Sequence, residues 1–223
     1  MAEALWTEVD HYIDAMLAPA DAVLTAAIES SNAAGLPPIN VTPNQGKFLH
    51  LLAKIAGARR ILEIGTLGGY STIWLARALP EGGRLVTIEA SPKHAEVARA
   101  NIARAGLAGC VDLRVGRALE VLPQIAAERG GAFDLIFIDA DKQSIPDYFR
   151  FALTLSRPGS VILVDNVVRD GRVIDTESRD PDIVGIRRFN ELLAAEPRVS
   201  ATAIQTVGVK GYDGLAVALV VAD

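Results

Sequence analysis

The 223-residue chain is long enough for one well-packed domain and too short for two of average size. Half of its residues are hydrophobic and 22% are charged, which is typical of a folded globular protein. The net charge is −5 and no basic block occurs, so we expect no nucleic-acid partner. No run approaches the roughly 20 apolar residues needed to cross a bilayer, and Glu3, Glu8 and Asp10 stand where a signal peptide would be basic. We therefore expect a cytoplasmic protein that does not insert into a membrane.

Cysteine and histidine are scarce in the chain. The single cysteine, Cys110, cannot form an intrachain disulfide. The three histidines are scattered and lack the spacing of a zinc site; they are His11, His50 and His94. We therefore expect neither thiol nor zinc chemistry.

The first quarter of the chain is predicted to be helical. No strand-like run of β-branched residues occurs in 2–57, and the turn-like segment 35–38 interrupts the helical pattern. Thr42 marks a helix start, because it can cap the helix and Pro43 suits the first helical position. Gln45 follows at the position from which a side chain can reach back in a capping box. We expect this helix to end near Gly57.

After residue 58 the pattern changes to short apolar runs that alternate with helical stretches. The strand-like runs cover 61–64, 85–88, 111–115, 133–138 and 161–164, and the helical stretches cover about 70–79, 92–105, 118–129 and 146–156. This alternation predicts a mostly parallel, doubly wound sheet with helices on both faces. The uninterrupted apolar runs at 133–138 and 161–164 are typical of strands buried on both sides.

The end of the chain follows a different pattern. Two strand-like runs, 198–206 and 215–221, bring the expected sheet to seven strands. The segment between them is too short for a helical crossover, so at least one of these strands is expected to join the sheet antiparallel. We expect a single α/β domain, with an N-terminal helical cap at 1–57 and the α/β core at 58–223.

A glycine-rich turn follows the first predicted strand, where an open α/β sheet binds its ligands. The turn, Gly65 to Gly69, lacks the lysine of a phosphate-binding loop, and Leu67 occupies the place of the second glycine in a dinucleotide fingerprint. Glu89 ends the next strand, where a carboxylate can accept hydrogen bonds from ribose hydroxyls. A ribose without a pyrophosphate favours S-adenosylmethionine; the alternative is a tight turn that binds no ligand.

Oxygen-bearing side chains end two further strands. Asp139 follows the fourth strand, and Asp165 and Asn166 follow the fifth. Neighbouring parallel strands lie about 4.8 Å apart, so these side chains can converge on one ion. Carboxylate and amide oxygens select Mg²⁺, Mn²⁺ or Ca²⁺ over zinc or copper. The alternative is that the acids cap neighbouring helices.

Four segments in this order resemble the metal-dependent small-molecule O-methyltransferases, a family that includes the catechol and caffeoyl-CoA O-methyltransferases. The segments are Glu63 to Ser71, Ile88-Glu89, Phe133 to Lys142 and Val164 to Asn166. The resemblance extends from about residue 40 to the Gly211–Gly214 turn and is fainter over the first 35 residues.

The resemblance implies a Rossmann-like fold, a homodimer and a set of site residues. The residues that match the S-adenosylmethionine site are Val41, Glu63, Gly65, Ser71, Glu89, Ala118 and Asp139. The metal ligands would be Asp139, Asp165 and Asn166, with Mg²⁺ as the favoured ion, and the catalytic residues would be Asp139 and Lys142. Ile145 departs from the family, because the plant caffeoyl-CoA enzymes usually carry an aromatic residue there, and this weakens the case for a CoA ester substrate.

Charge explains how such a site would work. A phenol is a poor nucleophile, whereas a divalent ion chelated by two vicinal oxygens lowers the hydroxyl pKa and fixes the geometry of attack. Lys142 lies three residues beyond Asp139, close enough to accept the leaving proton if it is neutral. The alternative is that Lys142 stays protonated and pairs with Asp139 or Asp141.

We therefore expect an S-adenosylmethionine-dependent, divalent-metal-dependent O-methyltransferase that acts on a small catechol-like or phenolic hydroxyl. Two alternatives stay open. The first is a metal-independent methyltransferase, in which Asp139, Asp165 and Asn166 only orient the substrate. The second is a nucleoside-binding or oxidoreductase-like protein that uses the same sheet.

Overall fold

A computed structural model describes residues 2–19, 21–128 and 130–223. Its centre is a seven-stranded sheet with the strand order β3-β2-β1-β4-β5-β7-β6. The strands are β1 (Arg60–Ile64), β2 (Arg84–Glu89), β3 (Val111–Val115), β4 (Leu135–Ile138), β5 (Val161–Asp165), β6 (Val199–Gly208) and β7 (Gly211–Val220). Strands β1 to β5 run parallel, and β7 pairs antiparallel with both β5 and β6. The predicted α/β fold class is thus confirmed, including the antiparallel C-terminal strand.

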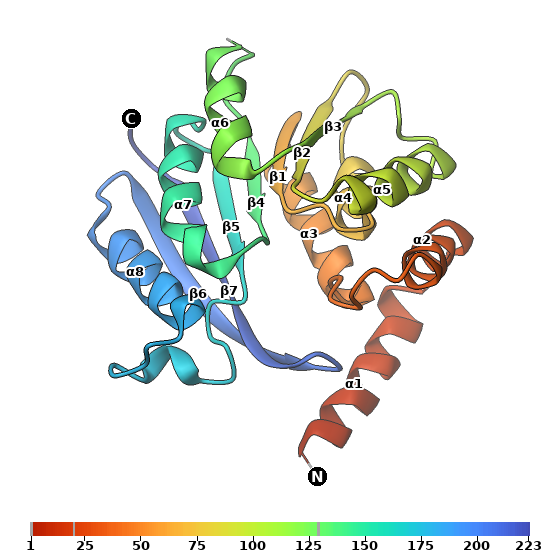
Figure 1. The fold of residues 1–223 in the computed structure, drawn as a ribbon, viewed down its shortest axis with the longest axis horizontal. Coiled ribbons are helices and arrows are strands. Elements are labelled where there is room, and N and C mark those ends of the chain that lie inside the picture. The colour runs from red at the N-terminus through yellow and green to blue at the C-terminus, as the bar shows by residue number, and fades with distance from the viewer. Residues whose placement is uncertain (1, 20, 129) are drawn as a thin grey trace.

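Helices cover both faces of the sheet. They are α1 (Ala2–Leu17), α2 (Ala22–Ala33), α3 (Pro43–Ile55), α4 (Tyr70–Ala76), α5 (Pro92–Arg104), α6 (Ala118–Ala127), α7 (Ile145–Thr154) and α8 (Pro181–Ala195), with short 3-10 turns η1 (Lys142–Ser144) and η2 (Arg172–Ile174). In Figure 1, α6, α7 and α8 lie on one side of the sheet and α3, α4 and α5 on the other. Residue 129, where the helix after β3 was expected to end, lies outside the described residues.

Strand β4 shows why the central strands read as uninterrupted apolar runs. Ile136 and Ile138 belong to the hydrophobic core beneath α6, α7 and α8, whereas Leu135 and Phe137 belong to the core beneath α3 and α4. All four side chains are fully buried. A strand between two cores has no polar face, as parallel sheets with helices on both sides require.

Several local expectations need correction. Helix α8 was not predicted, although Asp180 caps it and Pro181 fills its first turn, the same pattern that marked α3. The N-terminal segment has a second break, between α1 and α2, and α3 ends at Ile55. The capping box is only half formed: the Gln45 amide donates to Thr42 Oγ1 at 3.2 Å, but the Gln45 side chain turns towards β5.

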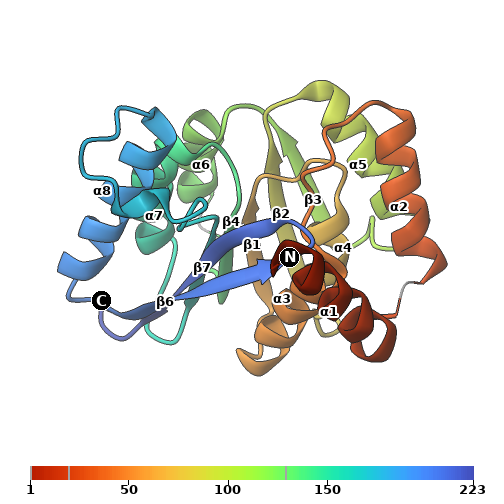
Figure 2. The ribbon, with the colours of Figure 1, turned by 90° about the horizontal axis from the view of Figure 1, so that it is seen from below.

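The first helix packs against α3 and against β6 at the end of the sheet. Figures 1 and 2 show α1 at the periphery of the molecule, beside the tip of the β6–β7 hairpin. Asp10 joins the two elements by accepting a hydrogen bond from the Val209 amide at 2.8 Å. Within the described part of the chain, no helix has the length and apolar character needed to span a bilayer.

The sheet topology places the predicted acids at one edge. Strands β4 and β5 are parallel neighbours, and Ile138 lies opposite Val164 in their register. Asp139 therefore follows β4 at the level where Asp165 ends β5. The chain order reverses between β1 and β4, which is where open α/β sheets form their ligand crevice.

Candidate active site

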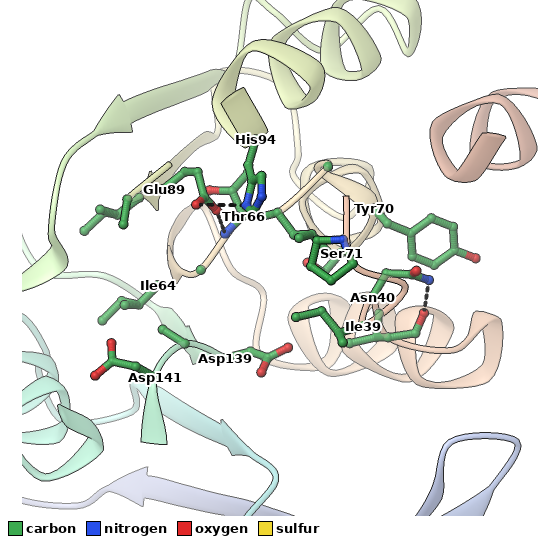
Figure 3. Close-up of a pocket in the computed structure, with 18 of the residues that line it drawn as sticks. Ile39, Asn40, Ile64, Thr66, Tyr70, Ser71, Glu89, His94, Asp139 and Asp141 are labelled. Carbon is green, nitrogen blue, oxygen red and sulfur yellow. Dashed lines mark hydrogen bonds and ion pairs between the residues drawn. The ribbon is translucent and has the colours of Figure 1, made fainter. Parts of the chain in front are cut away.

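A cavity of about 610 Å³ opens at the carboxyl ends of β1, β2 and β4. Figure 3 shows Glu89 and His94 side by side in this cavity, with Asp139 contributed from the end of β4. Most of the predicted site residues line it: Val41, Gly65, Ser71, Glu89, Ala118, Asp139, Lys142 and Asn166. Two predicted residues are absent from this lining: Glu63 is fully buried, and Asp165 lines a second cavity.

The turn after β1 depends on a glycine at its first position. Gly65 has a φ of +100°, and a Cβ there would overlap the Asp139 carbonyl oxygen. The close approach of the two strand ends therefore excludes any side chain at residue 65. The turn directs the Leu67 amide at Glu89, which accepts its hydrogen bond at 2.7 Å.

Glu89 is held firmly at the edge of β2. Its side chain is buried, and it accepts hydrogen bonds from the backbone amides of Thr66, Leu67 and Ser91. His94 Nδ1 lies 3.4 Å from Glu89 Oε1. The three amides fix the carboxylate at the cavity wall and take three of its roughly four lone-pair positions. The remaining position, on the oxygen near His94, is the one that a ligand's hydroxyl would use. The sequence analysis did not identify His94 as a cavity residue beside Glu89. The available signal was the Ser91-Pro92 cap, which places residue 94 in the first turn of α5, just after β2.

Glu63 lies beneath the cavity and reaches it through Ser71. It is fully buried, and its carboxyl accepts hydrogen bonds from the hydroxyls of Ser71, Thr72 and Thr87. Burial raises the pKa of Glu63 to about 7, against the opposing effect of those hydroxyls. Ser71 lines the cavity, so Glu63 orients a wall residue and is not itself on the wall.

The two acids at the ends of β4 and β5 influence each other. Asp165 is only 5% exposed, and burial together with the nearby charge of Asp139 raises its pKa. Asp165 Oδ1 accepts a hydrogen bond from the Asn166 amide at 2.8 Å. Asn166 has a left-handed φ of +60°, which asparagine tolerates better than most residues.

Lys142 completes the polar group at this edge. It is 8% exposed, and its Nζ donates to Asp139 Oδ1 at 2.9 Å. Helix α8 fixes the backbone of this turn, because a Cβ at Gly185 would overlap the Lys142 carbonyl oxygen. The unpredicted helix therefore helps to position the predicted lysine.

Tyr148 was also missed by sequence analysis. It lies on α7, lines the cavity, and donates a hydrogen bond to Asp141 Oδ1. Burial and the Asp141 carboxylate raise the pKa of Tyr148, which keeps the phenol protonated as a donor. Tyr148 lies three residues after Ile145, the position at which the chain departs from the plant caffeoyl-CoA enzymes, and so on the same side of the helix. Nothing in the sequence showed that this side of the helix faces the cavity.

The donor set fits a hard divalent ion. Across residues 2–19, 21–128 and 130–223, no three or more His, Cys, Asp or Glu side chains gather at a common metal position. The group at this edge is instead two carboxylates and one amide, Asp139, Asp165 and Asn166. All three offer oxygen ligands, and a dication between the two acids would relieve the repulsion that raises the Asp165 pKa.

Comparison with known protein families and curated proteins finds O-methyltransferases in both cases. The model of a family described as O-methyltransferase matches residues 8–219. A catechol O-methyltransferase of Niastella koreensis is 55% identical over 220 residues, covering 99% of this chain and 100% of that protein.

Two solved structures are similar over nearly their whole length. The O-methyltransferase from Bacillus cereus, solved in complex with SAH, is 61% identical with a TM-score of 0.96, covering 97% of this chain and 99% of that one. The O-methyltransferase TomG from Streptomyces achromogenes, involved in tomaymycin synthesis and solved in complex with SAM, is 51% identical with a TM-score of 0.97, covering 100% of both chains.

Proposed function

The chain belongs to the O-methyltransferase family, and from that membership we propose that it transfers a methyl group from S-adenosylmethionine to a hydroxyl of a small catechol-like or phenolic compound, with a divalent metal ion. The observation that carries the proposal is the pair of acids at neighbouring strand ends: Asp139 lines the cavity that Glu89 also lines, and Asp165 ends the next strand, near enough to feel the charge of Asp139. The Niastella koreensis relative, named a catechol O-methyltransferase, supports the choice of acceptor.

The donor would lie along the glycine turn. The SAH and SAM complexes of the two similar structures support this ligand for the present chain. Glu89 would accept hydrogen bonds from the ribose hydroxyls, and Ser71, held by Glu63, would contact the methionine end. Val41 and Ala118 line the same cavity and would contribute apolar contacts.

The metal ion would be held by Asp139, Asp165 and Asn166, and Mg²⁺ suits these oxygen ligands best. When bound, such an ion supplies a lowered acceptor pKa, from about 10 for a phenol towards neutrality, which corresponds to roughly 4 kcal/mol. Asn166 lines this cavity and, together with Asp165, a second cavity of about 260 Å³, so the acceptor hydroxyls would reach the ion where the two cavities share Asn166.

Lys142 would accept the proton that the acceptor loses. Lys142 lines the cavity and its Nζ donates to Asp139 Oδ1, so it would stand beside one of the carboxylates that hold the ion. An ammonium cannot accept a proton, and Lys142 must therefore lose one before the transfer. In the second possibility the ammonium keeps its proton and serves as a fixed positive charge at the acceptor oxygen.

Transfer of labelled methyl from S-adenosylmethionine to catechol, phenol, a flavonoid and a caffeoyl ester tests the proposal. We expect monomethylated catechol, identified by mass spectrometry, and a slower reaction with phenol because it has one oxygen instead of two vicinal ones. Calorimetry with SAH and with NAD separates the alternative: tighter binding of NAD would exclude the methyltransferase activity in favour of an oxidoreductase-like protein.

We also propose that the protein acts as a homodimer. The support is a row of exposed apolar side chains on α1, namely Leu5, Val9, Tyr12, Met16 and Leu17. A helix at the periphery of the molecule with such a row gains stability when a second copy covers it. The cytoplasmic location expected from the sequence is likewise a proposal.

A further inference from the structure

The side chain of Gln45 does not serve the helix it begins. Its Nε2 donates to Asp165 Oδ2 at 2.6 Å, across 120 positions in the sequence. The partner is one of the most deeply buried charged groups in the described chain. A capping role would leave the side chain at the start of α3, so this contact needs another explanation.

Gln45 is held in place from three directions. Its backbone amide donates to the Thr42 hydroxyl, and Pro43 fixes the first turn of α3. The next residue, Gly46, lies so close to Trp74 that a Cβ there would overlap the indole ring. Helix α3 is therefore packed tightly against α4, and the side-chain amide of Gln45 projects from a rigid element.

The two hydrogen bonds on Asp165 determine the rotation of its carboxylate. The Asn166 amide donates to Oδ1 and Gln45 donates to Oδ2, one bond on each oxygen. A carboxylate has about four lone-pair positions, so each oxygen keeps one for a metal ion. Groups that hydrogen-bond to a metal ligand orient it and strengthen its binding.

We propose that Gln45 is a positioning residue that holds the Asp165 carboxylate in the orientation needed for the divalent ion. This inference rests on the proposed function, because it concerns the ion at Asp139, Asp165 and Asn166. Gln45 does not line the 610 Å³ cavity proposed for S-adenosylmethionine; with Asp165 and Asn166 it lines the second cavity, of about 260 Å³. Loss of its amide should therefore weaken ion binding and leave donor binding unchanged.

Calorimetric titration of the full chain with Mn²⁺, and separately with SAH, tests this role. The Gln45→Met variant keeps the length of the side chain and removes the hydrogen-bonding amide, and Gln45→Ala removes the side chain beyond Cβ. We expect both to bind Mn²⁺ roughly 10- to 100-fold more weakly than the wild type. SAH affinity should stay at the wild-type level. Gln124→Ala is the matched control, because Gln124 is exposed and, among the described residues, its side chain donates to the Glu120 carbonyl of its own helix; it should change neither affinity.

The possible outcomes separate this inference from the proposed function. Wild-type Mn²⁺ affinity in both Gln45 variants would overturn the positioning role and leave the metal-dependent reaction intact. An equal loss of Mn²⁺ and SAH affinity would also overturn it, because it would indicate general damage to the site. A wild-type protein that binds no Mn²⁺ would remove the proposed ion, and the positioning role with it.

Discussion

Glu63 shows how a single buried residue makes stability depend on pH. Its pKa, about 7 in the folded chain, is higher than that of an exposed glutamate because burial disfavours the charged form. The folded chain therefore binds this proton more tightly than the unfolded chain does. The stabilisation is complete below the unfolded pKa and is lost as pH rises through about 7.

Replacing Glu63 by glutamine should remove this pH dependence. Between pH 5 and 7, we expect the free energy of unfolding of the wild type to fall relative to Glu63→Gln by about 1 kcal/mol per pH unit. Urea unfolding of both proteins at pH 5, 6 and 7 measures the difference. Parallel stability curves would show that Glu63 is already charged across this range.

The role of Lys142, as a proton acceptor or as a fixed positive charge, can be assigned by comparing two substitutions. If the neutral amine accepts the proton, Lys142→Met and Lys142→Arg should both lower kcat by about 10²- to 10⁴-fold, because arginine stays protonated. If the ammonium acts only as a fixed charge, Lys142→Arg should keep most of the activity. The measurement is kcat at saturating donor and acceptor, and a nearly active arginine variant would contradict the proton-accepting role.

At the level of elements, the turn between β1 and α4 has the strictest requirement for a glycine. Gly65 combines a left-handed φ with a close approach to Asp139, so a methyl group there meets both backbone strain and overlap. Gly57 has a similar left-handed φ of +60° but open space around it. Comparing alanine substitutions at Gly57 and Gly65 therefore separates the cost of backbone strain from the cost of steric overlap.

We expect Gly57→Ala to cost about 1 kcal/mol of stability, and Gly65→Ala to cost several times as much. Gly65→Ala should also weaken SAH binding, because the turn must shift away from β4. Urea unfolding and calorimetry give the two quantities. Equal costs for the two variants, with unchanged SAH affinity, would mean that the turn at Gly65 adapts freely.

Elements with strong local signals were predictable from the sequence. The apolar runs predicted β4 and β5, and the cap-then-proline pattern at Thr42 and Ser91 predicted the starts of α3 and α5. Helix α8 carries the same pattern at Asp180, and its buried apolar residues Ile183, Ile186 and Phe189 recur three residues apart, so its local signal was present and was overlooked. The Gln45 contact could not be predicted, because it joins residues 120 positions apart and depends on how α3 packs against the sheet.

At the scale of the whole molecule, the site follows from topology. The parallel order of β4 and β5 was enough to predict that Asp139 and Asp165 would lie at neighbouring strand ends, since it fixes which strands are adjacent. The burial of Glu63 and Asp165 was not predictable, because burial depends on the helices that cover each face. The place of Lys142 was only partly predictable: its three-residue spacing from Asp139 put it near that carboxylate, whereas the packing of α8 on its turn is seen only in the fold.

The exposed face of α1 gives a prediction about assembly. Light scattering coupled to size-exclusion chromatography should give about twice the 23.6 kDa chain mass. The double variant Tyr12→Glu, Met16→Glu places charges four residues apart on this exposed helix and should shift the protein towards the monomer. A wild type that elutes as a monomer at micromolar concentration would contradict the proposed dimer.

Methyl transfer from labelled S-adenosylmethionine to catechol, catalysed by metal-stripped protein with and without added Mg²⁺, tests the metal-dependent reaction most directly. The protein's metal content is checked by elemental analysis, and Asp165→Asn serves as a variant with an impaired ion site. We predict background transfer without Mg²⁺, recovery of the rate on its addition, and little recovery in Asp165→Asn. An undiminished rate in wild-type protein shown to be free of metal would contradict the account.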